Sequence, residues 1–338
     1  MNNNRLLSIV VPVFNETEVI EAFYERTKKV VDSLDTFSYE IIFVDDGSKD
    51  GSYQKLVELA NSDPSVRIIK FSRNFGHQIA ITAGTDMAKG DAVVVIDADL
   101  QDPPEVIRDF VAKWEAGYDV VYGLREKRPG ENKIKLLTAA MFYRILKAFT
   151  KVDIPVDVGD FRLVSKRAMG HLRELREHDR FVRGLCCWIG FKQTAVHYRR
   201  EKRYAGVTKY PYRKMIKFAL DGLTSFSSVP LKLATLLGYT TSLLAFIYAC
   251  SVFIQKAVGI TVQGWATLMI GMLFLGGVQL ICIGIMGEYV ARIFNQTKQR
   301  PMYIVEEIYG SKRDSDVKMS LGESFSELQI NNRLKSLG

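Results

Sequence analysis

Apolar residues in the first 125 positions follow two alternating periods. Short continuous apolar runs are typical of buried strands, whereas apolar residues that recur every three or four positions are typical of helices. The runs predict strands at Leu7–Val13, Glu40–Val44, Val66–Phe71, Ala92–Ile96 and Asp119–Tyr122, and the periodic segments predict helices at Glu18–Leu34, Ser52–Ala60, His77–Met87 and Pro104–Ala116. Strands that alternate with helices favour βαβ units, so we expect an α/β domain with a mostly parallel, Rossmann-like sheet.

Two stretches near the C-terminus carry no charged residue. Leu233–Ile254 is uncharged over 22 residues, and Trp265–Gly287 is uncharged over 23 residues. At about 1.5 Å per residue, a helix of either length covers the roughly 30 Å hydrocarbon core of a bilayer. We therefore predict a hairpin of two transmembrane helices over residues 231–290.

Basic residues flank this hairpin on both sides. They are Arg213, Lys214, Lys217 and Lys232 before it, and Arg292, Lys298 and Arg300 after it. Cytoplasmic flanks of membrane helices are enriched in Lys and Arg. The N-terminus also lacks the charged start and long apolar run of a secretory signal. We expect a multi-pass protein of the plasma membrane, with its N-terminal domain and both termini in the cytoplasm.

The remaining segments complete the predicted organisation. Residues 1–210 form the cytosolic α/β domain. Residues 211–230 carry apolar residues at helical spacing beside the first span, which predicts an interfacial amphipathic helix; the alternative is a helix that packs this face on the domain. Residues 291–310 form a cytosolic return segment. Residues 311–338 are polar, with few aromatic residues, and are predicted to be a flexible tail.

Composition narrows the class of protein. The chain has 338 residues, a formal net charge of +8 and 47% hydrophobic residues, which excludes global disorder. Its four cysteines lack metal-ligand spacing and favour reduced thiols over a disulfide scaffold. Residues 199–217 hold eight Lys or Arg and one acid. Beside a membrane hairpin, such a run favours contact with anionic lipid head groups, so nucleic acid is not an expected partner.

Polar clusters follow three of the predicted strands. Asp97, Asp99 and Gln101 come after one strand, and clusters that contain Glu16 and Asp46 come after two others. Ligands of such sheets bind beyond the carboxyl ends of the strands. Two carboxylates two positions apart suit Mg²⁺ or Mn²⁺, which also takes oxygens from substrate phosphates. Each cluster alone fits ordinary turn chemistry, but all three together favour a nucleotide-diphosphate site.

These motifs resemble those of a known family. The segments that carry the resemblance are Val11–Glu16, Val44–Ser48, Ser72–Gly76, Asp97–Pro104, Gly159–Leu163 and Phe274–Leu280. The chain resembles family 2 glycosyltransferases with the GT-A fold, and among them the membrane-anchored polyprenyl-phosphate glycosyltransferases. That group includes dolichol-phosphate mannose synthases and bacterial bactoprenol glucosyltransferases. The match spans about residues 6–309, and the Gly-Asp-Phe-Arg-Leu segment with the two-helix anchor is most similar to the bactoprenol enzymes.

The resemblance implies roles for the matching positions. It places nucleotide-sugar contacts at Pro12, Phe14, Glu16, Asp46 and Asp97, metal contacts at Asp97, Asp99 and Gln101, and acceptor-phosphate contacts at Arg200, Arg203 and Lys209. Asp160 and Arg203 would be the catalytic residues. The alternative for Asp160 is a buried aspartate paired with Arg162. Arg125 fits either closure over the diphosphate or a solvated loop, and His77 is expected only to start a helix.

The expected activity is transfer of one hexose, from UDP-glucose, to a polyprenyl phosphate such as undecaprenyl phosphate. Inversion would give a polyprenyl-phosphate-linked sugar for modification of a cell-envelope glycan. UDP-GlcNAc, UDP-GalNAc, a UDP-4-amino-arabinose derivative and GDP-mannose remain open as donors, and so does a non-catalytic membrane scaffold with the same fold. The small pair Gly276-Gly277 is compatible with a homo-oligomer such as a tetramer.

Overall fold

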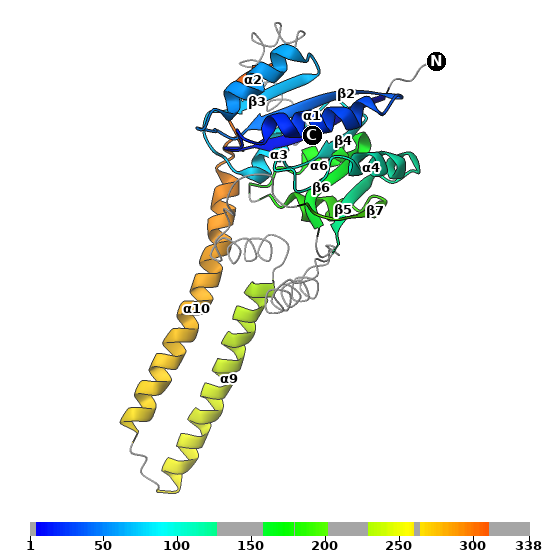
Figure 1. Ribbon diagram of the computed structural model, residues 1–338. Coiled ribbons are helices and arrows are strands. Elements are labelled where there is room, and N and C mark those ends of the chain that lie inside the picture. The colour runs from blue at the N-terminus through cyan, green and yellow to red at the C-terminus, as the bar shows by residue number, and fades with distance from the viewer. Residues whose placement is uncertain (1–4, 127–157, 179, 202–228, 260–263, 311–338) are drawn as a thin grey trace, which may run out of the picture.

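The computed structural model describes residues 5–126, 158–178, 180–201, 229–259 and 264–310 (Figure 1). Eight strands form one sheet in the order β7-β5-β6-β4-β1-β2-β3-β8. The strands are β1 Arg5–Val13, β2 Phe37–Asp45, β3 Val66–Phe71, β4 Ala92–Val95, β5 Val120–Arg125, β6 Val158–Ser165, β7 Gln193–Tyr198 and β8 Val305–Tyr309. The helices of the sheet domain are α1 Ile20–Asp32, α2 Ser52–Ser62, α3 His77–Met87, α4 Val106–Glu115, α6 Lys166–Glu174 and α7 Val182–Trp188.

Helices cover both faces of the sheet. Side chains of β1 alternate between the two faces, so that Ile9 and Val11 belong to one buried cluster and Val10 belongs to the other. The first cluster includes residues of α1, α2 and α4, and the second includes residues of α3, α6 and α7. The result is a three-layer α/β/α domain, which confirms the predicted fold class.

Two strands run against the parallel direction. Strands β4, β1, β2 and β3 are parallel neighbours, as predicted. Strand β6 lies between β4 and β5 and is antiparallel to both. Strand β8 is antiparallel to β3 and is the outermost strand on that side of the sheet. Because β6 is reversed, its first residues, and not its last, lie beside the carboxyl ends of the parallel strands.

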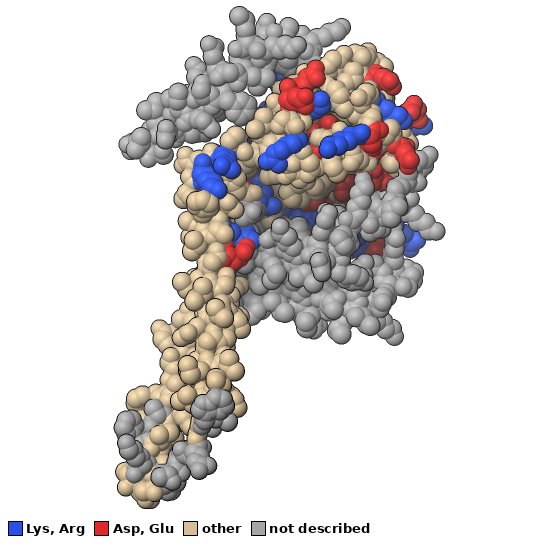
Figure 2. Space-filling model, turned by 90° about the vertical axis from the view of Figure 1, so that its left-hand side faces the viewer, with Lys and Arg blue, Asp and Glu red and all other residues tan. Residues whose placement is uncertain are grey.

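Two long helices extend away from the sheet domain side by side (Figure 1). They are α9 Val229–Ala257 and α10 Trp265–Thr297, and both are long and apolar enough to cross a membrane. In Figure 2 the surface of this hairpin is almost free of charged side chains, which gather on the sheet domain. The predicted hairpin is thus present as two helices, and α10 continues beyond the uncharged stretch that ends at Gly287.

The end of α10 contacts the sheet domain. Its Gln296 accepts a hydrogen bond from the His178 backbone N–H at 3.1 Å and donates one to the Arg176 carbonyl oxygen at 3.1 Å. The chain then forms β8, so the predicted return segment supplies an edge strand of the sheet. The predicted interfacial helix lies, apart from its last two residues, outside the described part of the chain. The predicted polar tail lies wholly outside it.

Candidate active site

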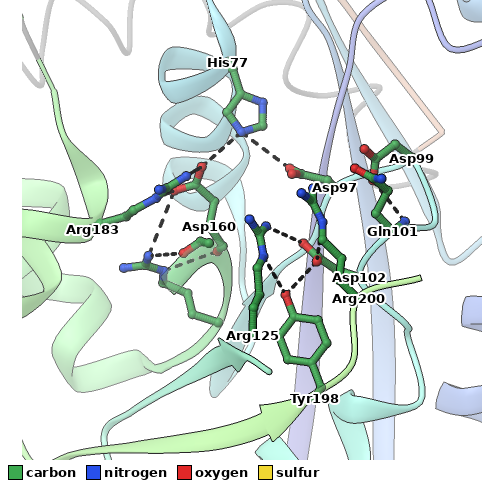
Figure 3. Close-up of polar contacts among 12 residues, drawn as sticks. His77, Asp97, Asp99, Gln101, Asp102, Arg125, Asp160, Arg183, Tyr198 and Arg200 are labelled. Atoms are coloured by element: carbon green, nitrogen blue, oxygen red, sulfur yellow. Dashed lines mark hydrogen bonds and ion pairs between the residues drawn. The ribbon is translucent and has the colours of Figure 1, made fainter. Parts of the chain in front are cut away.

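The Asp97–Asp102 loop turns sharply where β4 ends. Leu100 has a left-handed backbone with φ of 56°, a conformation that costs a non-glycine residue roughly 1–2 kcal/mol. Its side chain is buried, and burial of an apolar side chain offsets such a cost. Asp99 Oδ1 accepts a hydrogen bond from the Gln101 backbone N–H at 3.1 Å. The strained turn therefore places Asp97, Asp99 and Gln101 together on one short loop (Figure 3).

The donor set of this loop fits a divalent cation that is shared with a substrate. Asp97 Oδ1 is buried and accepts no hydrogen bond from the described residues, although His77 Nε2 lies 3.4 Å away. Those residues contain no group of three or more His, Cys, Asp or Glu side chains arranged to hold a metal. Mg²⁺ is commonly held by one or two carboxylates and completed by phosphate oxygens. Asp97 and Asp99 suit that kind of site.

His77 lies between two carboxylates. Its Nε2 is 3.4 Å from Asp97 Oδ1 and 3.3 Å from Asp160 Oδ2 (Figure 3). Burial lowers the pKa of His77, but the charge of Asp97 and the hydrogen bond to Asp160 raise it to about 9. Burial raises the pKa of Asp97 to about 6, and the nearby carboxylates act in the same direction. His77 does start α3, as predicted, but it also belongs to the site.

Asp160 occupies the reversed start of β6 and is buried. Arg183 donates from Nε and Nη2 to its two carboxylate oxygens, each at 2.9 Å. Arg162, the partner considered from sequence, lies farther away, with Nη2 4.0 Å from Oδ1. Burial raises the pKa of Asp160, but Arg183 and His77 outweigh it and hold this pKa well below its usual range. Asp160 is therefore held as a carboxylate.

Asp102 organises a second cluster and is fully buried. It accepts hydrogen bonds from Tyr198 Oη at 2.6 Å and from Arg125 Nη2 at 3.3 Å, and Arg200 Nε lies 3.5 Å away (Figure 3). Arg125 packs closely on Gly159, where a Cβ would lie 2.5 Å from its Nη2. Asp102 thus orients two guanidinium groups at the edge where β5 and β7 end. Arg125 belongs to this cluster and not to a solvated loop.

The residues expected at the nucleoside differ in their surroundings. Phe14 is exposed just after β1, and Pro12 lies within that strand. Asp46 is buried and accepts hydrogen bonds from Asn74 Nδ2 and from the backbone N–H groups of residues 75 and 76, at 2.6–3.0 Å. The Asp46 carboxylate thus fastens the turn after β2 to the loop before α3. Its contact with a nucleoside stays a prediction.

The turn after β2 also depends on a glycine. Gly47 has φ of +71°, and a Cβ there would lie 2.7 Å from the Arg73 carbonyl carbon. Glu16, on the loop after β1, donates its backbone N–H to Ser52 Oγ at 2.9 Å. The loops that follow the first two strands are thereby held against each other. Arg203 and Lys209, predicted to bind the acceptor phosphate, lie outside the described residues.

Sequence patterns missed Arg183, Asp102 and Tyr198. Asp102 lies in the same motif as Asp97 and Asp99, so its position alone could have suggested a role. Arg183 and Tyr198 are far from that motif along the chain and stand in no recognisable pattern. The sheet order brings β7, which ends at Tyr198, beside β5, and the packing of α7 against β6 brings Arg183 to the site.

Comparisons with known proteins identify a family for the sheet domain and for the hairpin. Residues 8–173 match the family described as glycosyl transferase family 2, and residues 229–293 match a domain described as the GtrB C-terminal hairpin. The uncharacterized glycosyltransferase YkcC of Bacillus subtilis is 51% identical over 92% of this chain and 96% of its own length. The hairpin and these relatives indicate that the protein associates with a membrane.

Other relatives carry more specific names. The bactoprenol glucosyl transferase of Shigella phage SfV is 42% identical over 89% of this chain and 98% of its own length. A prophage bactoprenol glucosyl transferase homolog of Escherichia coli is 41% identical over 89% of this chain and 99% of its own length. These relatives confirm the resemblance inferred from the motifs.

Similarity to solved structures is weaker. Glucosyl-3-phosphoglycerate synthase from Mycobacterium tuberculosis, in complex with Mn²⁺, UDP-glucose and phosphoglyceric acid, is 18% identical with a TM-score of 0.44. The similarity covers 64% of this chain and 76% of that one. From the sequence relationships, the chain belongs to glycosyltransferase family 2 and is a glycosyltransferase.

Proposed function

We propose that the protein transfers glucose from UDP-glucose to a polyprenyl phosphate, such as undecaprenyl phosphate, with inversion at the anomeric carbon. The observation that carries this proposal is the 42% identity to the bactoprenol glucosyl transferase of Shigella phage SfV over 98% of that protein. An identity that extends over so much of both chains includes the sheet domain and the hairpin. The product would serve the modification of a cell-envelope glycan.

The proposed step is a single displacement. An oxygen of the acceptor phosphate forms a bond to C1 of the sugar while the bond from C1 to the diphosphate oxygen breaks. UDP leaves with the electron pair, and no proton has to move because the acceptor phosphate is already ionised. The buried, ionised carboxylate of Asp160 supports a reaction without proton transfer, since it can stabilise positive charge on the sugar without serving as a base.

Three further sets of residues complete the proposed site. Asp97, Asp99 and Gln101 would hold Mg²⁺ or Mn²⁺, which when bound neutralises charge on the diphosphate. Pro12, Phe14, Glu16 and Asp46 would form the nucleoside side of the donor site. Arg200, with Arg203 and Lys209, would bind the acceptor phosphate, because guanidinium groups form paired hydrogen bonds with phosphate. Arg200 is held near Asp102, which supports its part in this set.

The proposed orientation has the sheet domain and both termini in the cytoplasm, with α9 and α10 as a two-pass anchor. The end of α10 and the sheet domain are in contact, which supports a common side of the membrane for both. A reporter that is active only in the cytoplasm, fused after Gly338, should be active. A reporter that is active only outside the cell should be silent at the same position.

A transfer assay tests the proposed reaction. Purified protein in detergent is mixed with undecaprenyl phosphate, Mg²⁺ or Mn²⁺ and a panel of labelled donors, and the label in the lipid is counted. Label from UDP-glucose supports the proposal, and inversion is checked from the anomeric configuration of the product. Label from UDP-GlcNAc, UDP-GalNAc, a UDP-4-amino-arabinose derivative or GDP-mannose, and not from UDP-glucose, would show that the protein uses that other donor. Nucleotide binding with no transfer from any donor would favour a non-catalytic scaffold.

A further inference from the structure

The carboxylate of Asp160 is surrounded by donors from two helices that follow different strands. Arg183, on α7, meets both oxygens through Nε and Nη2 at 2.9 Å, in a parallel two-bond geometry (Figure 3). Such paired bonds fix the plane of a carboxylate as well as its position. Asp160 is 4% exposed, so little water competes for these bonds. Its orientation is therefore set chiefly by protein groups.

Gln78 adds a second connection. Its Nε2 donates to Asp160 Oδ2 at 3.1 Å, and its Oε1 accepts from the Val182 backbone N–H at 3.1 Å. One side chain of α3 therefore ties the start of α7 to Asp160. Because Arg183 directly follows Val182, this contact also fixes the base of the arginine that holds the carboxylate.

The backbone beside Asp160 is fixed as well. Arg162 is almost fully buried and donates to the carbonyl oxygens of Gly159, at 2.8 Å, and of Asp160, at 3.3 Å. Arg162 thus holds the main chain, while Arg183 holds the side chain. His77 Nε2 also approaches the carboxylate, at 3.3 Å from Oδ2, and lies between it and Asp97. Direct contacts of this kind hold a reacting group within a fraction of an ångström of its productive position.

We infer that Arg183 is a positioning residue of the transfer reaction: through its two bonds to Asp160, it holds this carboxylate in the orientation from which it faces the sugar. The inference rests on the proposed function. It differs from a direct role, in which Arg183 would grip the diphosphate and its loss would weaken donor binding. The two roles predict different kinetic changes, because positioning acts on the transition state through Asp160 alone.

The first experiment compares steady-state transfer by four proteins in the same detergent: wild type, Asp160→Asn, Arg183→Met and the double variant. Arg183→Met should lower kcat about 10- to 100-fold, the size of effect that a misplaced reacting group produces, with the donor KM nearly unchanged. The double variant should be slower than Asp160→Asn by no more than about twofold, because the arginine acts only through the aspartate. Arg183→Lys keeps the charge without the paired geometry and should fall between wild type and Arg183→Met.

Arg167→Met is the matched control. Arg167 is also an arginine in an ion pair, with Nη2 2.6 Å from Asp119 Oδ2, but its side chain is 69% exposed and it lies on α6, outside the site. Its kcat should stay within about twofold of wild type. A loss in Arg167→Met as large as that in Arg183→Met would overturn the inference, because the effect would then be general to arginine removal.

A second experiment measures the unfolding temperatures (Tm) of the same four proteins: wild type, the two single variants and the double variant. Arg183→Met leaves the buried Asp160 charge with fewer partners and should lower Tm, whereas Asp160→Asn in the same chain should restore part of the loss. Independent Tm losses, additive kcat losses, or a raised donor KM with kcat unchanged would each overturn the inference. A wild type that transfers no sugar from any donor would instead overturn the proposed function, and the positioning role with it.

Discussion

The ring of Tyr303 stacks on that of Phe71 where the α9–α10 hairpin meets the sheet. The ring centroids are 5.4 Å apart and the planes differ by 18°. Tyr303 Oη also donates to Asp86 Oδ2 at 2.9 Å. Since Tyr303 follows α10 and Phe71 ends β3, this pair fastens the end of the hairpin to the sheet domain.

Removal of this stack should loosen the junction. Tyr303→Ala loses both the ring contact and the hydrogen bond, and should lower the free energy of unfolding by about 2–3 kcal/mol. Tyr303→Phe keeps the ring and should lose only about 1 kcal/mol. Thermal unfolding of the detergent-solubilised protein measures both changes. Equal losses in the two variants would show that the stack itself contributes nothing.

Loss of the Asp102 charge should disturb both guanidinium groups that it orients. Asp102→Asn removes the carboxylate that faces Arg125 and Arg200, so we expect a transfer rate about 10- to 100-fold lower. Tyr198→Phe removes only the hydroxyl that donates to Asp102 and should have a smaller effect. Initial rates with saturating donor and acceptor make the comparison. Wild-type activity in Asp102→Asn would show that the cluster is not needed for transfer.

Activity should depend on a divalent cation and on the acidic pair that would hold it. Chelation should abolish transfer, and added Mg²⁺ or Mn²⁺ should restore it. Asp99→Ala should lower kcat by at least about 100-fold, because unneutralised charge on the diphosphate disfavours its departure. Asp91→Asn is the control, since Asp91 precedes β4 at the opposite edge of the sheet and contacts Lys166 and the Leu6 backbone. Full activity of Asp99→Ala under chelation would exclude the proposed metal role.

Stability should depend on pH through Asp63, far from the site. Burial raises the pKa of Asp63, but hydrogen bonds from Lys28, Tyr24 and Ser65 outweigh it and hold this pKa below its usual range. A lowered folded-state pKa stabilises the protein above the unfolded pKa, about 3.9, and this contribution disappears as the pH falls toward the folded value.

Asp63→Asn isolates that contribution. At neutral pH the variant should be less stable than wild type by about 1–2 kcal/mol, the size expected for hydrogen bonds to a charged group. The difference in Tm between the two proteins should shrink as the pH is lowered below about 4. A difference that stays constant across this range would mean that the Asp63 charge does not contribute.

The parallel part of the fold was predictable from local patterns. The strand Val66–Phe71 and the helix His77–Met87 have the predicted limits, because each is a clear apolar run or helical repeat. Strand β6 was missed because charged Asp160 and Arg162 interrupt its apolar residues. Both are buried and paired, so their burial depends on partners that only the tertiary structure supplies.

The limits of α10 show a related effect. The uncharged stretch ends at Gly287, but the helix continues through Glu288 and Arg292, which form an ion pair one turn apart at 3.3 Å. The first charged residues show where the apolar surface of the helix ends. They do not end the helix itself, because oppositely charged residues one turn apart stabilise it. The acidic loop after β4 was predictable because its residues are adjacent in sequence. The Arg183–Asp160 pair was not, because its members meet only through folding.

The position of strand β8 in the sequence determines when the sheet can be completed during synthesis of the chain. In the sequence, the hairpin α9–α10 lies between the sheet domain and this strand. The edge strand beside β3 can therefore form only after both helices of the hairpin have been synthesised. Shortening the gene at residue 228 would therefore remove more than the hairpin. It would leave β3 as an open edge, with unpaired backbone groups that invite aggregation. A water-soluble version of this enzyme would have to keep residues 305–309 on a linker that replaces the hairpin.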